Sequence, residues 1–392
     1  MERKHWMDNL LWVTVLLVLF YHVFYFYNNK GVFGGVGGFG DYPECKQYQD
    51  IVMYILYPWF MMLLFLVAGI SSRYALGPAV PEPVEGPRYL SNKQFIKSRT
   101  LKLLVPATIG LFVFQWMTGY FNTQVAALAQ GTDLFANIPD EVPNCIKNII
   151  KYFAYSLSGT GPLWFIQDLW VFSLLIVLIK KLDKNDRFWN WCGKANIPII
   201  ILLGVLIWLA SQALIMNPRD DSPDGLYNLY KPLTYFIPFL LGYFVFSHVE
   251  VQDRVEKMHL PMFICAVAAG VALCWTGWGK NNTSPQFLSG WLNCLYAWLM
   301  ILAMLGCFKA WFDKTSKFAT YMTKSSFGVY VLHYLVIAAL GYMMKMYTNL
   351  APWMMYVILF VAVMTIPFAL YEIIKRIPFI RWCVLGIKKK KA

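Results

Sequence analysis

Residues 10–27 read LLWVTVLLVLFYHVFYFY and carry only one ionisable side chain apart from the tyrosines, that of His22. A helix of about 18 such residues rises ~1.5 Å per residue and crosses most of a ~30 Å hydrocarbon core. This stretch therefore predicts a transmembrane helix, with His22 roughly 18 Å above Leu10. Ionisable groups inside a membrane are candidates for function. The alternative is an interfacial histidine that ends an aromatic belt.

The composition of the whole chain agrees with a membrane protein. The chain has 392 residues, of which 58% are hydrophobic and 14% charged, and its mean hydropathy is +0.49. Soluble domains carry about 25% charged residues. The first apolar stretch is long and aromatic, and no A-x-A cleavage site follows it. We therefore expect it to be retained as a helix rather than removed as a signal peptide.

Further apolar runs extend the prediction to an all-α, polytopic membrane protein of about ten transmembrane helices. We expect one transmembrane domain over 1–392, with a short N-terminus (1–8) and a basic tail (375–392). The other spans are predicted at 50–72, 100–118, 163–182, 196–216, 232–248, 260–278, 287–308, 326–346 and 353–374.

Basic residues set the expected orientation. The N-terminus, alternate loops and the tail hold 26 of the 34 lysines and arginines, and the opposite loops hold 8. This asymmetry places both termini in the cytoplasm. It also explains the net charge of +13 without a nucleic-acid partner. The terminal KKKK (388–391) is interpreted as an anchor to anionic membrane lipid.

The loops carry little recognisable chemistry. Residues 28–49 form a glycine-rich outer loop without the G-K-[ST] ending of a phosphate loop, and 77–92 form a proline-rich linker. The outer segment 119–162 is expected to hold a short interfacial helix at NIIKYFAYSL. The eight cysteines show no metal-ligand spacing, so no metal site is predicted. Cys45 and Cys145 both lie in predicted outer loops. They either form a disulfide with each other or remain free thiols.

One polar residue within the spans is a candidate for acid–base chemistry besides His22. Asp168 lies ~8 Å into a helix that enters from outside, where a carboxylate needs a donor. If it met His22, it would fix the imidazole tautomer and raise the basicity of the other nitrogen. The alternative is a bond from Asp168 to Gln167 or to the backbone.

His333 lies in SSFGVYVLHYLV, three residues after Tyr330 and on the same helix face. With a span starting at 326, it is expected only ~10 Å from the inner surface, roughly 8 Å below His22. No direct contact is implied, and a structural histidine is favoured. At the inner mouth of another span, Arg99 and Lys102 lie one turn apart. They are candidates for binding donor phosphates or are ordinary topology anchors.

Several segments resemble the acyltransferase 3 family of membrane acyltransferases and follow one another in its order. Within it, the chain is most similar to the glucans biosynthesis protein C-like group, associated with succinylation of periplasmic glucans. The segments are MDNLLWVTVLLVLFYH, PWFMMLLFLVAGISS, KSRTLKLLVP, GPLWFIQDLW, YFIPFLLGYFVF, SSFGVYVLH and YEIIKRIPFIR.

The resemblance implies a multi-pass protein of the bacterial inner or plasma membrane, and an enzyme of the EC 2.3.1 class. Such an enzyme moves an acetyl or succinyl group from cytosolic acyl-CoA to a hydroxyl of an extracytoplasmic glycan, with no cofactor besides the donor. It implies His22 as the catalytic base, which Asp168 would assist. The expected substrate-binding residues are Arg99, Lys102, Trp164, Tyr330, His333 and Glu372. The competing functions are a transporter or flippase of a glycan or lipid-linked intermediate, and a sensor or scaffold.

One position departs from the family pattern. Members carry an arginine eleven residues before the first-helix histidine, and Leu11 stands there in this chain. That position lies ~16 Å below His22 by helical rise, on the side where the charged donor enters. Either a neighbour such as Arg3 or Lys102 supplies the charge, or the activity is weak or absent.

Overall fold

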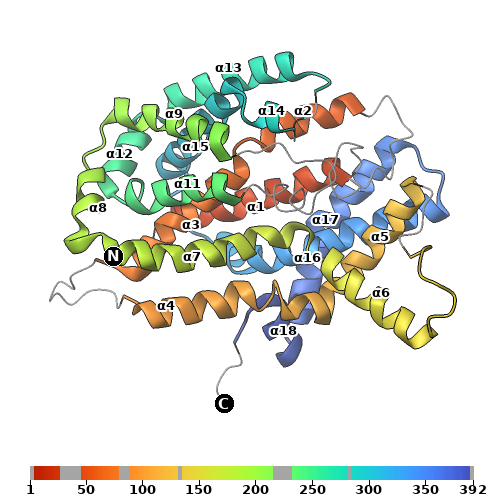
Figure 1. Cartoon of the computed structure of the whole chain (residues 1–392). Coiled ribbons are helices and arrows are strands. Elements are labelled where there is room, and N and C mark those ends of the chain that lie inside the picture. Colours follow the sequence, from red (N-terminus) through yellow and green to blue (C-terminus); the bar gives the residue numbers. More distant parts are fainter. Residues whose placement is uncertain are drawn as a thin grey trace. The chain divides into compact units, whose positions relative to one another are not determined.

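The computed structural model describes residues 4–26, 46–78, 89–130, 135–214, 232–280, 282 and 284–388. All regular structure in these ranges is helical (Figure 1). The α-helices are α1 (His5–Phe26), α2 (Lys46–Leu56), α3 (Phe60–Leu76), α4 (Asn92–Arg99), α5 (Trp116–Gln130), α6 (Asn144–Ser158), α7 (Trp164–Leu182), α8 (Arg187–Cys192), α9 (Ile197–Leu214), α11 (Pro232–Phe244), α12 (Val249–Lys257), α13 (His259–Gly277), α14 (Pro285–Leu288), α15 (Trp291–Trp311), α16 (Lys317–Tyr347), α17 (Pro352–Ile374) and α18 (Pro378–Leu385).

The all-α, polytopic prediction is confirmed. In the part of the chain that is described, eight helices are long and apolar enough to cross a membrane. A ninth span arises if α11 and α12, which meet at a bend of 105°, count as one. These nine coincide with nine of the ten predicted spans.

The predicted span at 100–118 differs from the others because it is not one continuous α-helix. α4 passes into a π-helical turn over Thr100–Leu104, where the Val105 N–H donates to the Thr100 carbonyl at 3.1 Å. Pro106 has no N–H to continue the ladder. A second π-helical turn, Leu111–Gln115, precedes α5. Wide turns of this kind occur frequently at functional sites.

The chain divides into two compact units. Unit 1 comprises Met1–Thr14, Tyr54–Arg99 and Asp168–Thr323, and unit 2 comprises Val15–Met53, Thr100–Gln167 and Lys324–Ala392. Four boundaries fall inside α1, α2, α7 and α16, so each of these helices contributes to both units.

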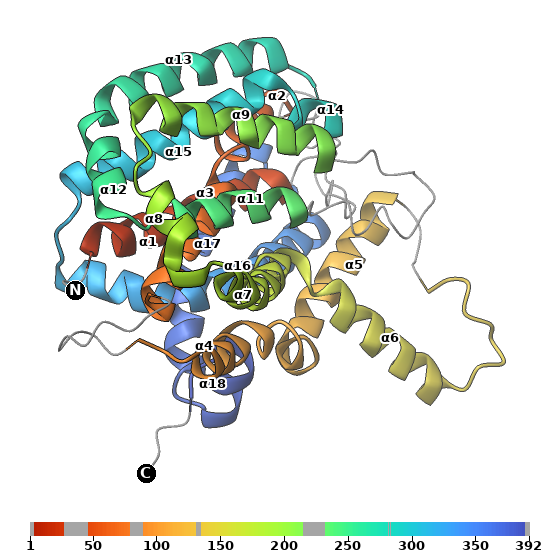
Figure 2. The ribbon, with the colours of Figure 1, turned by 60° about the vertical axis from the view of Figure 1, so that its left-hand side comes forward.

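Unit 1 has its core where α3 packs on α11. Gly69 and Gly242 allow the two backbones to meet, because a Cβ on Gly69 would lie 2.0 Å from the Phe239 carbonyl oxygen and one on Gly242 would lie 2.0 Å from that of Leu66. Small residues permit such close approach in membrane helices. α15 is largely buried, while α13 beside it exposes most of its apolar face (Figures 1 and 2).

Unit 2 contains the helical hairpin of α5 and α6, which lie side by side in both views (Figures 1 and 2). α6 includes the NIIKYFAYSL segment, so a helix there is confirmed. Its exposed apolar residues recur at helical spacing, which is typical of a helix that lies in a membrane interface. They are Ile146, Ile149, Ile150, Phe153 and Leu157.

Several predictions fall outside the described residues. They include Cys45, most of the glycine-rich loop, residues 79–88 of the proline-rich linker, Arg3 and the end of the lysine tail. Cys145 is described as an exposed free thiol, and its pairing with Cys45 stays a prediction.

Candidate active site

The centre of unit 2 holds a pair of histidines from different helices. The His333 Nε2 atom lies 3.3 Å from the His22 Nδ1 atom, and the two ring centroids are 4.9 Å apart. His333 is fully buried on α16, whereas the His22 side chain on α1 is half-buried. The His22 ring therefore points toward α16.

Backbone acceptors fix the tautomer of each ring. The His22 Nδ1 atom lies 2.8 Å from the Val18 carbonyl oxygen, and the His333 Nδ1 atom lies 2.6 Å from that of Tyr330. A carbonyl only accepts, so we assign the proton to Nδ1 in both neutral rings. The His333 Nε2 lone pair then faces the His22 Nδ1–H. Among the described residues nothing bonds the His22 Nε2 atom, whose lone pair is left for a substrate proton.

The contact between these histidines corrects a prediction. His333 was expected about 8 Å below His22 because its span was taken to start at residue 326. α16 instead begins at Lys317, so His333 is 16 residues into its helix, and His22 is 17 residues into α1. At ~1.5 Å per residue the two imidazoles reach nearly the same height.

The starts of both helices are tied together in unit 1. The Trp6 N–H donates to Asp313 Oδ1 at 2.9 Å, and Asn9 Nδ2 donates to the Phe312 and Lys314 carbonyls at 2.7 and 2.8 Å. These bonds fix the beginning of α1 beside the loop that leads into α16. The register of the two helices is thus set from their first turns.

Aromatic rings line the histidine pair. Tyr334 and Tyr25 pack edge-on against His22, with centroid distances of 5.5 and 6.0 Å. Tyr330 packs against His333 at 5.7 Å. Its hydroxyl donates to the Pro162 carbonyl, which joins the predicted YxxH and GPLWF segments. Trp164 begins α7 two residues later, so it lies beside this contact in the chain.

Gln115 supports the same region and was not predicted from the sequence. Its Nε2 atom donates to the Val331 carbonyl at 2.9 Å, and its Oε1 atom accepts from Thr118 at 2.7 Å. Both residues are buried. A lone amide in the apolar run LFVFQWM is the signal that would have found it, because a buried amide needs partners.

Asp168 belongs to unit 1 and His22 to unit 2, so the predicted contact between them stays a prediction. The alternative bond to Gln167 is not present, since the Gln167 Nε2 atom donates to the Ala107 carbonyl at 3.1 Å. The Asp168 Oδ2 atom is buried and has no hydrogen-bond partner within the described ranges.

Arg99 and Lys102 occupy unlike environments. Arg99 ends α4, donates from Nη2 to Ser72 Oγ at 3.2 Å and lies over the Phe95 ring. Burial lowers the pKa of Arg99 to about 10, so the guanidinium remains charged at neutral pH. Lys102 is exposed within the π-helical turn. Arg99 belongs to unit 1 and Lys102 to unit 2, so their joint role at a donor stays a prediction.

Glu372 lies near the end of α17, where its carboxylate pairs with Lys375 at 2.5 Å. The neighbouring Tyr371 hydroxyl donates to the Lys324 carbonyl at 3.2 Å. This arrangement joins the end of α17 to α16 within unit 2. It favours a structural contribution of this end of α17, and the substrate contact of Glu372 stays a prediction.

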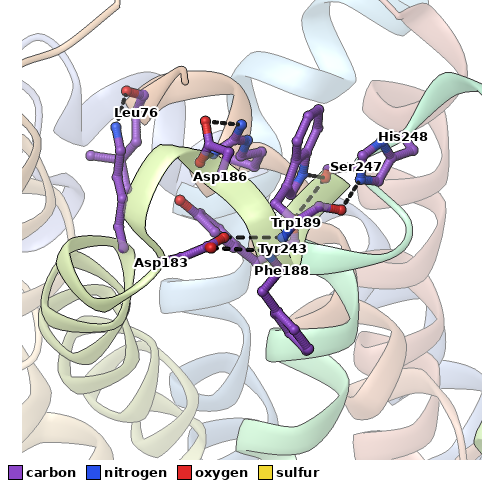
Figure 3. A network of polar contacts seen from close by, with 10 residues as sticks. Leu76, Asp183, Asp186, Phe188, Trp189, Tyr243, Ser247 and His248 are labelled. Carbon is purple, nitrogen blue, oxygen red and sulfur yellow. Dashed lines mark hydrogen bonds and ion pairs between the residues drawn. The ribbon is translucent and has the colours of Figure 1, made fainter. Parts of the chain in front are cut away.

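A charged cluster in unit 1 was also missed. Arg73 on α3 forms two parallel hydrogen bonds to Asp186, at 2.8 and 3.0 Å, with both side chains more than nine-tenths buried. Its guanidinium stacks on Trp189 at 4.0 Å. Trp189 Nε1 donates to Ser247 Oγ, and the Trp189 carbonyl contacts His248 Nε2 (Figure 3). Arg73 was counted only as a basic loop residue.

Comparisons with known proteins agree with these observations. No curated protein and no solved structure matches the chain. The family model described as an acyltransferase domain matches residues 4–372, which is nearly the whole chain. Together with the helical bundle and its buried polar residues, this match shows that the chain belongs to the acyltransferase 3 family and is a polytopic membrane acyltransferase.

Proposed function

We propose that the protein is an O-acyltransferase in which His22 is the general base. The observation that carries the proposal is the open Nε2 atom of His22, opposite an Nδ1–H that is held by Val18 and His333. A base whose tautomer is fixed by its other nitrogen is the arrangement used in serine hydrolases, with a carboxylate in place of the second imidazole. An imidazole partner stabilises the protonated base without placing a negative charge among apolar helices.

The reaction that this geometry supports is a direct transfer. The acceptor hydroxyl gives its proton to His22 Nε2 as its oxygen attacks the thioester carbonyl. The new C–O bond forms, the C–S bond breaks, and the proton passes from His22 to the departing thiolate. His333 acts as a positioning residue, because its Nε2 lone pair accepts from the His22 Nδ1–H while His22 carries the additional positive charge.

The donor in this proposal is a cytosolic acyl-CoA. Arg99 supports it, since this half-buried cation contacts the Ser72 hydroxyl and has no carboxylate partner among the described residues. An uncompensated buried charge is unfavourable until an anion arrives. A guanidinium also suits a phosphate because of its fixed fork of donors.

The acceptor and the acyl group follow from the family resemblance. We propose an acetyl or succinyl group, an extracytoplasmic glycan hydroxyl as its acceptor, and the bacterial cell membrane as the location. Tyrosines around His22 support a sugar acceptor, because rings with hydroxyl groups bind both faces and edges of sugars through packing and hydrogen bonds.

The test is the loss of His22 with folding controlled. The His22→Ala variant is expected to lose acyl transfer by about 10²- to 10⁴-fold, the usual contribution of a general base. His5→Ala, which removes another histidine of the same helix, is the matched control and should keep activity. Transfer would be followed by mass spectrometry of surface glycans and by thiol release from acetyl-CoA and succinyl-CoA. A folded His22→Ala protein with undiminished transfer contradicts the proposal.

A further inference from the structure

Unit 1 contains an open cavity of about 860 Å³ at its predicted cytoplasmic end. Its volume falls within the ~300–1,000 Å³ of small-molecule sites. The lining comes from the segment after α3, the start of α4 and the end of α7. It consists of Leu76, Pro78, Tyr89, Leu90, Ser91, Asn92, Lys180, Lys181, Asp183, Lys184 and Asn185.

Specific contacts hold the walls of this cavity in place. The Leu90 N–H donates to the Ala75 carbonyl at 2.9 Å, and Lys180 Nζ donates to the Leu76 carbonyl at 2.7 Å. The Tyr89 ring lies directly on Gly77, where a Cβ would approach it to 2.3 Å and where φ is +62°. One end of Tyr89 is thereby fixed, and 39% of the residue stays exposed toward the cavity side.

The charge of the lining favours an anion. Three lysines face one carboxylate, that of Asp183. Both Asp183 oxygens already accept, from the Phe188 N–H at 2.8 Å and the Trp189 N–H at 3.0 Å (Figure 3). Lys181 and Lys184 are exposed and form no ion pair with the residues that the structure describes. Two cations without counter-charges therefore remain for a ligand.

The start of α4 adds donors at the same cavity. Ser91 and Gln94 cap each other, because Ser91 N–H donates to Gln94 Oε1 at 3.0 Å and Gln94 N–H donates to Ser91 Oγ at 3.3 Å. The N–H groups of Asn92 and Lys93 are not used by this capping box. Helix N-termini with such groups attract phosphate.

We propose that this cavity binds the 3′-phosphoadenosine end of the acyl-CoA donor, with Lys181 and Lys184 on its phosphates and Tyr89 against the adenine. This assignment rests on the proposed function and adds the site of the donor's nucleotide. Arg99 ends the helix that begins here, and its Cα lies about 10 Å along α4 from that of Asn92. The diphosphate and the pantetheine arm would extend from the cavity in that direction.

The test measures binding rather than turnover, with the full chain in nanodiscs of zwitterionic lipid. The probes are coenzyme A, dephospho-coenzyme A and adenosine 3′,5′-bisphosphate. The double variant Lys181→Glu/Lys184→Glu should bind coenzyme A at least tenfold more weakly, about the loss of one charge-assisted hydrogen bond. It should also lose the wild-type preference for coenzyme A over its dephospho form.

Two further variants test the individual parts of the site. Asp183→Asn keeps a side chain that can cap α8 and removes the carboxylate among the described lining residues, so coenzyme A should bind a few-fold more tightly. Tyr89→Ala should weaken adenosine 3′,5′-bisphosphate while leaving phosphopantetheine unchanged. Lys314→Glu/Lys317→Glu is the matched control, since both lysines are exposed on the same predicted side and outside the cavity.

The outcomes separate this site from the catalytic proposal. Equal coenzyme A affinity in the two double variants would overturn the assignment. So would competition by phosphatidylglycerol but not by adenosine 3′,5′-bisphosphate, which would make the ligand a lipid headgroup. Because His22→Ala protein can be used for every binding measurement, an absence of acyl transfer leaves the result of this test intact.

Discussion

Two pairs of polar side chains inside the protein satisfy their hydrogen-bonding groups in opposite ways. In unit 1, Arg73 and Asp186 are both charged, are joined by two hydrogen bonds, and are enclosed by Trp189. In unit 2, His22 and His333 are joined by one longer contact of 3.3 Å, and one ring nitrogen of the pair is left open. The first pair has its donors and acceptors used internally, whereas the second keeps an acceptor for another molecule.

The difference suits the first pair to stabilising the fold and the second pair to proton transfer. A buried ion pair costs desolvation of two charges and becomes strongly destabilising when one partner is lost. A neutral imidazole pair costs less to bury, and it can accept and release a proton. The backbone supports this division, since Asn185 and Asp186 hold left-handed conformations with φ of 59° and 54° to aim the carboxylate at Arg73. Strain of this kind persists only where surrounding contacts enforce it.

The largest effect should come from breaking the charged pair. Arg73→Ala leaves the Asp186 carboxylate buried and unpaired, so we expect a loss of about 3–5 kcal/mol of stability. The measurement is the denaturation midpoint, with the folded fraction from gel filtration. Arg73→Met/Asp186→Leu should recover much of the loss, because it removes both charges. A midpoint unchanged in Arg73→Ala would mean that the pair is not structural.

A smaller effect, on activity instead of stability, should follow from His333. His333→Ala removes one of the two acceptors of the His22 Nδ1–H, leaving the Val18 carbonyl, and should lower kcat roughly 10- to 100-fold, the usual effect of losing an orienting partner. His333→Gln keeps an acceptor oxygen and should recover part of the rate. The KM for the donor should stay unchanged in both variants. Equal losses in Ala and Gln variants, or a loss confined to KM, would argue for packing or substrate binding instead.

The smallest effect concerns Lys4, a cation of unit 1 with only neutral acceptors. Its Nζ donates to Tyr74 Oη at 2.9 Å and to Gln252 Oε1 at 2.6 Å. Burial, and then repulsion from Lys309, lowers the pKa of Lys4 from 10.5 to about 8. The folded protein therefore binds this proton less tightly than the unfolded chain does, and the resulting cost is constant below pH 8.

Stability should accordingly rise between pH 8 and pH 10.5, because in this range the folded protein has released the proton while the unfolded chain still binds it. The comparison is the difference in melting temperature between the wild type and Lys4→Met, measured across this range. That difference should move in favour of the wild type with increasing pH. A flat difference would show that Lys4 is solvated in the folded protein.

The membrane-spanning helices could be predicted from the sequence because each depends on the composition of its own segment. Runs of about 20 apolar residues predicted nine spans that coincide with helices, since the bilayer imposes a length and internal hydrogen bonding on each run. The segment 100–118 was apolar too, but Pro106 and two π-helical turns interrupt it. Hydropathy does not show where a helix changes from α-helical to π-helical hydrogen bonding.

The site was only partly accessible from sequence. His22, Tyr330 and His333 were identified as residues, but the contact of the two imidazoles depends on where α16 begins. Residues 317–325 are polar enough that hydropathy started the span nine residues late. The Arg73–Asp186 pair was not predicted, because it joins side chains 113 positions apart through a turn with two left-handed residues.

The interleaving of the two units has a consequence for how the gene can be divided. The chain passes from one unit to the other after residues 14, 53, 99, 167 and 323, and four of these passages lie inside α1, α2, α7 and α16. A single cut after residue 323 keeps all of unit 1 but also two segments of unit 2, so no single cut separates the two units. Truncated alleles should therefore never act as half-enzymes, and domain shuffling during evolution would have to exchange this chain as a whole.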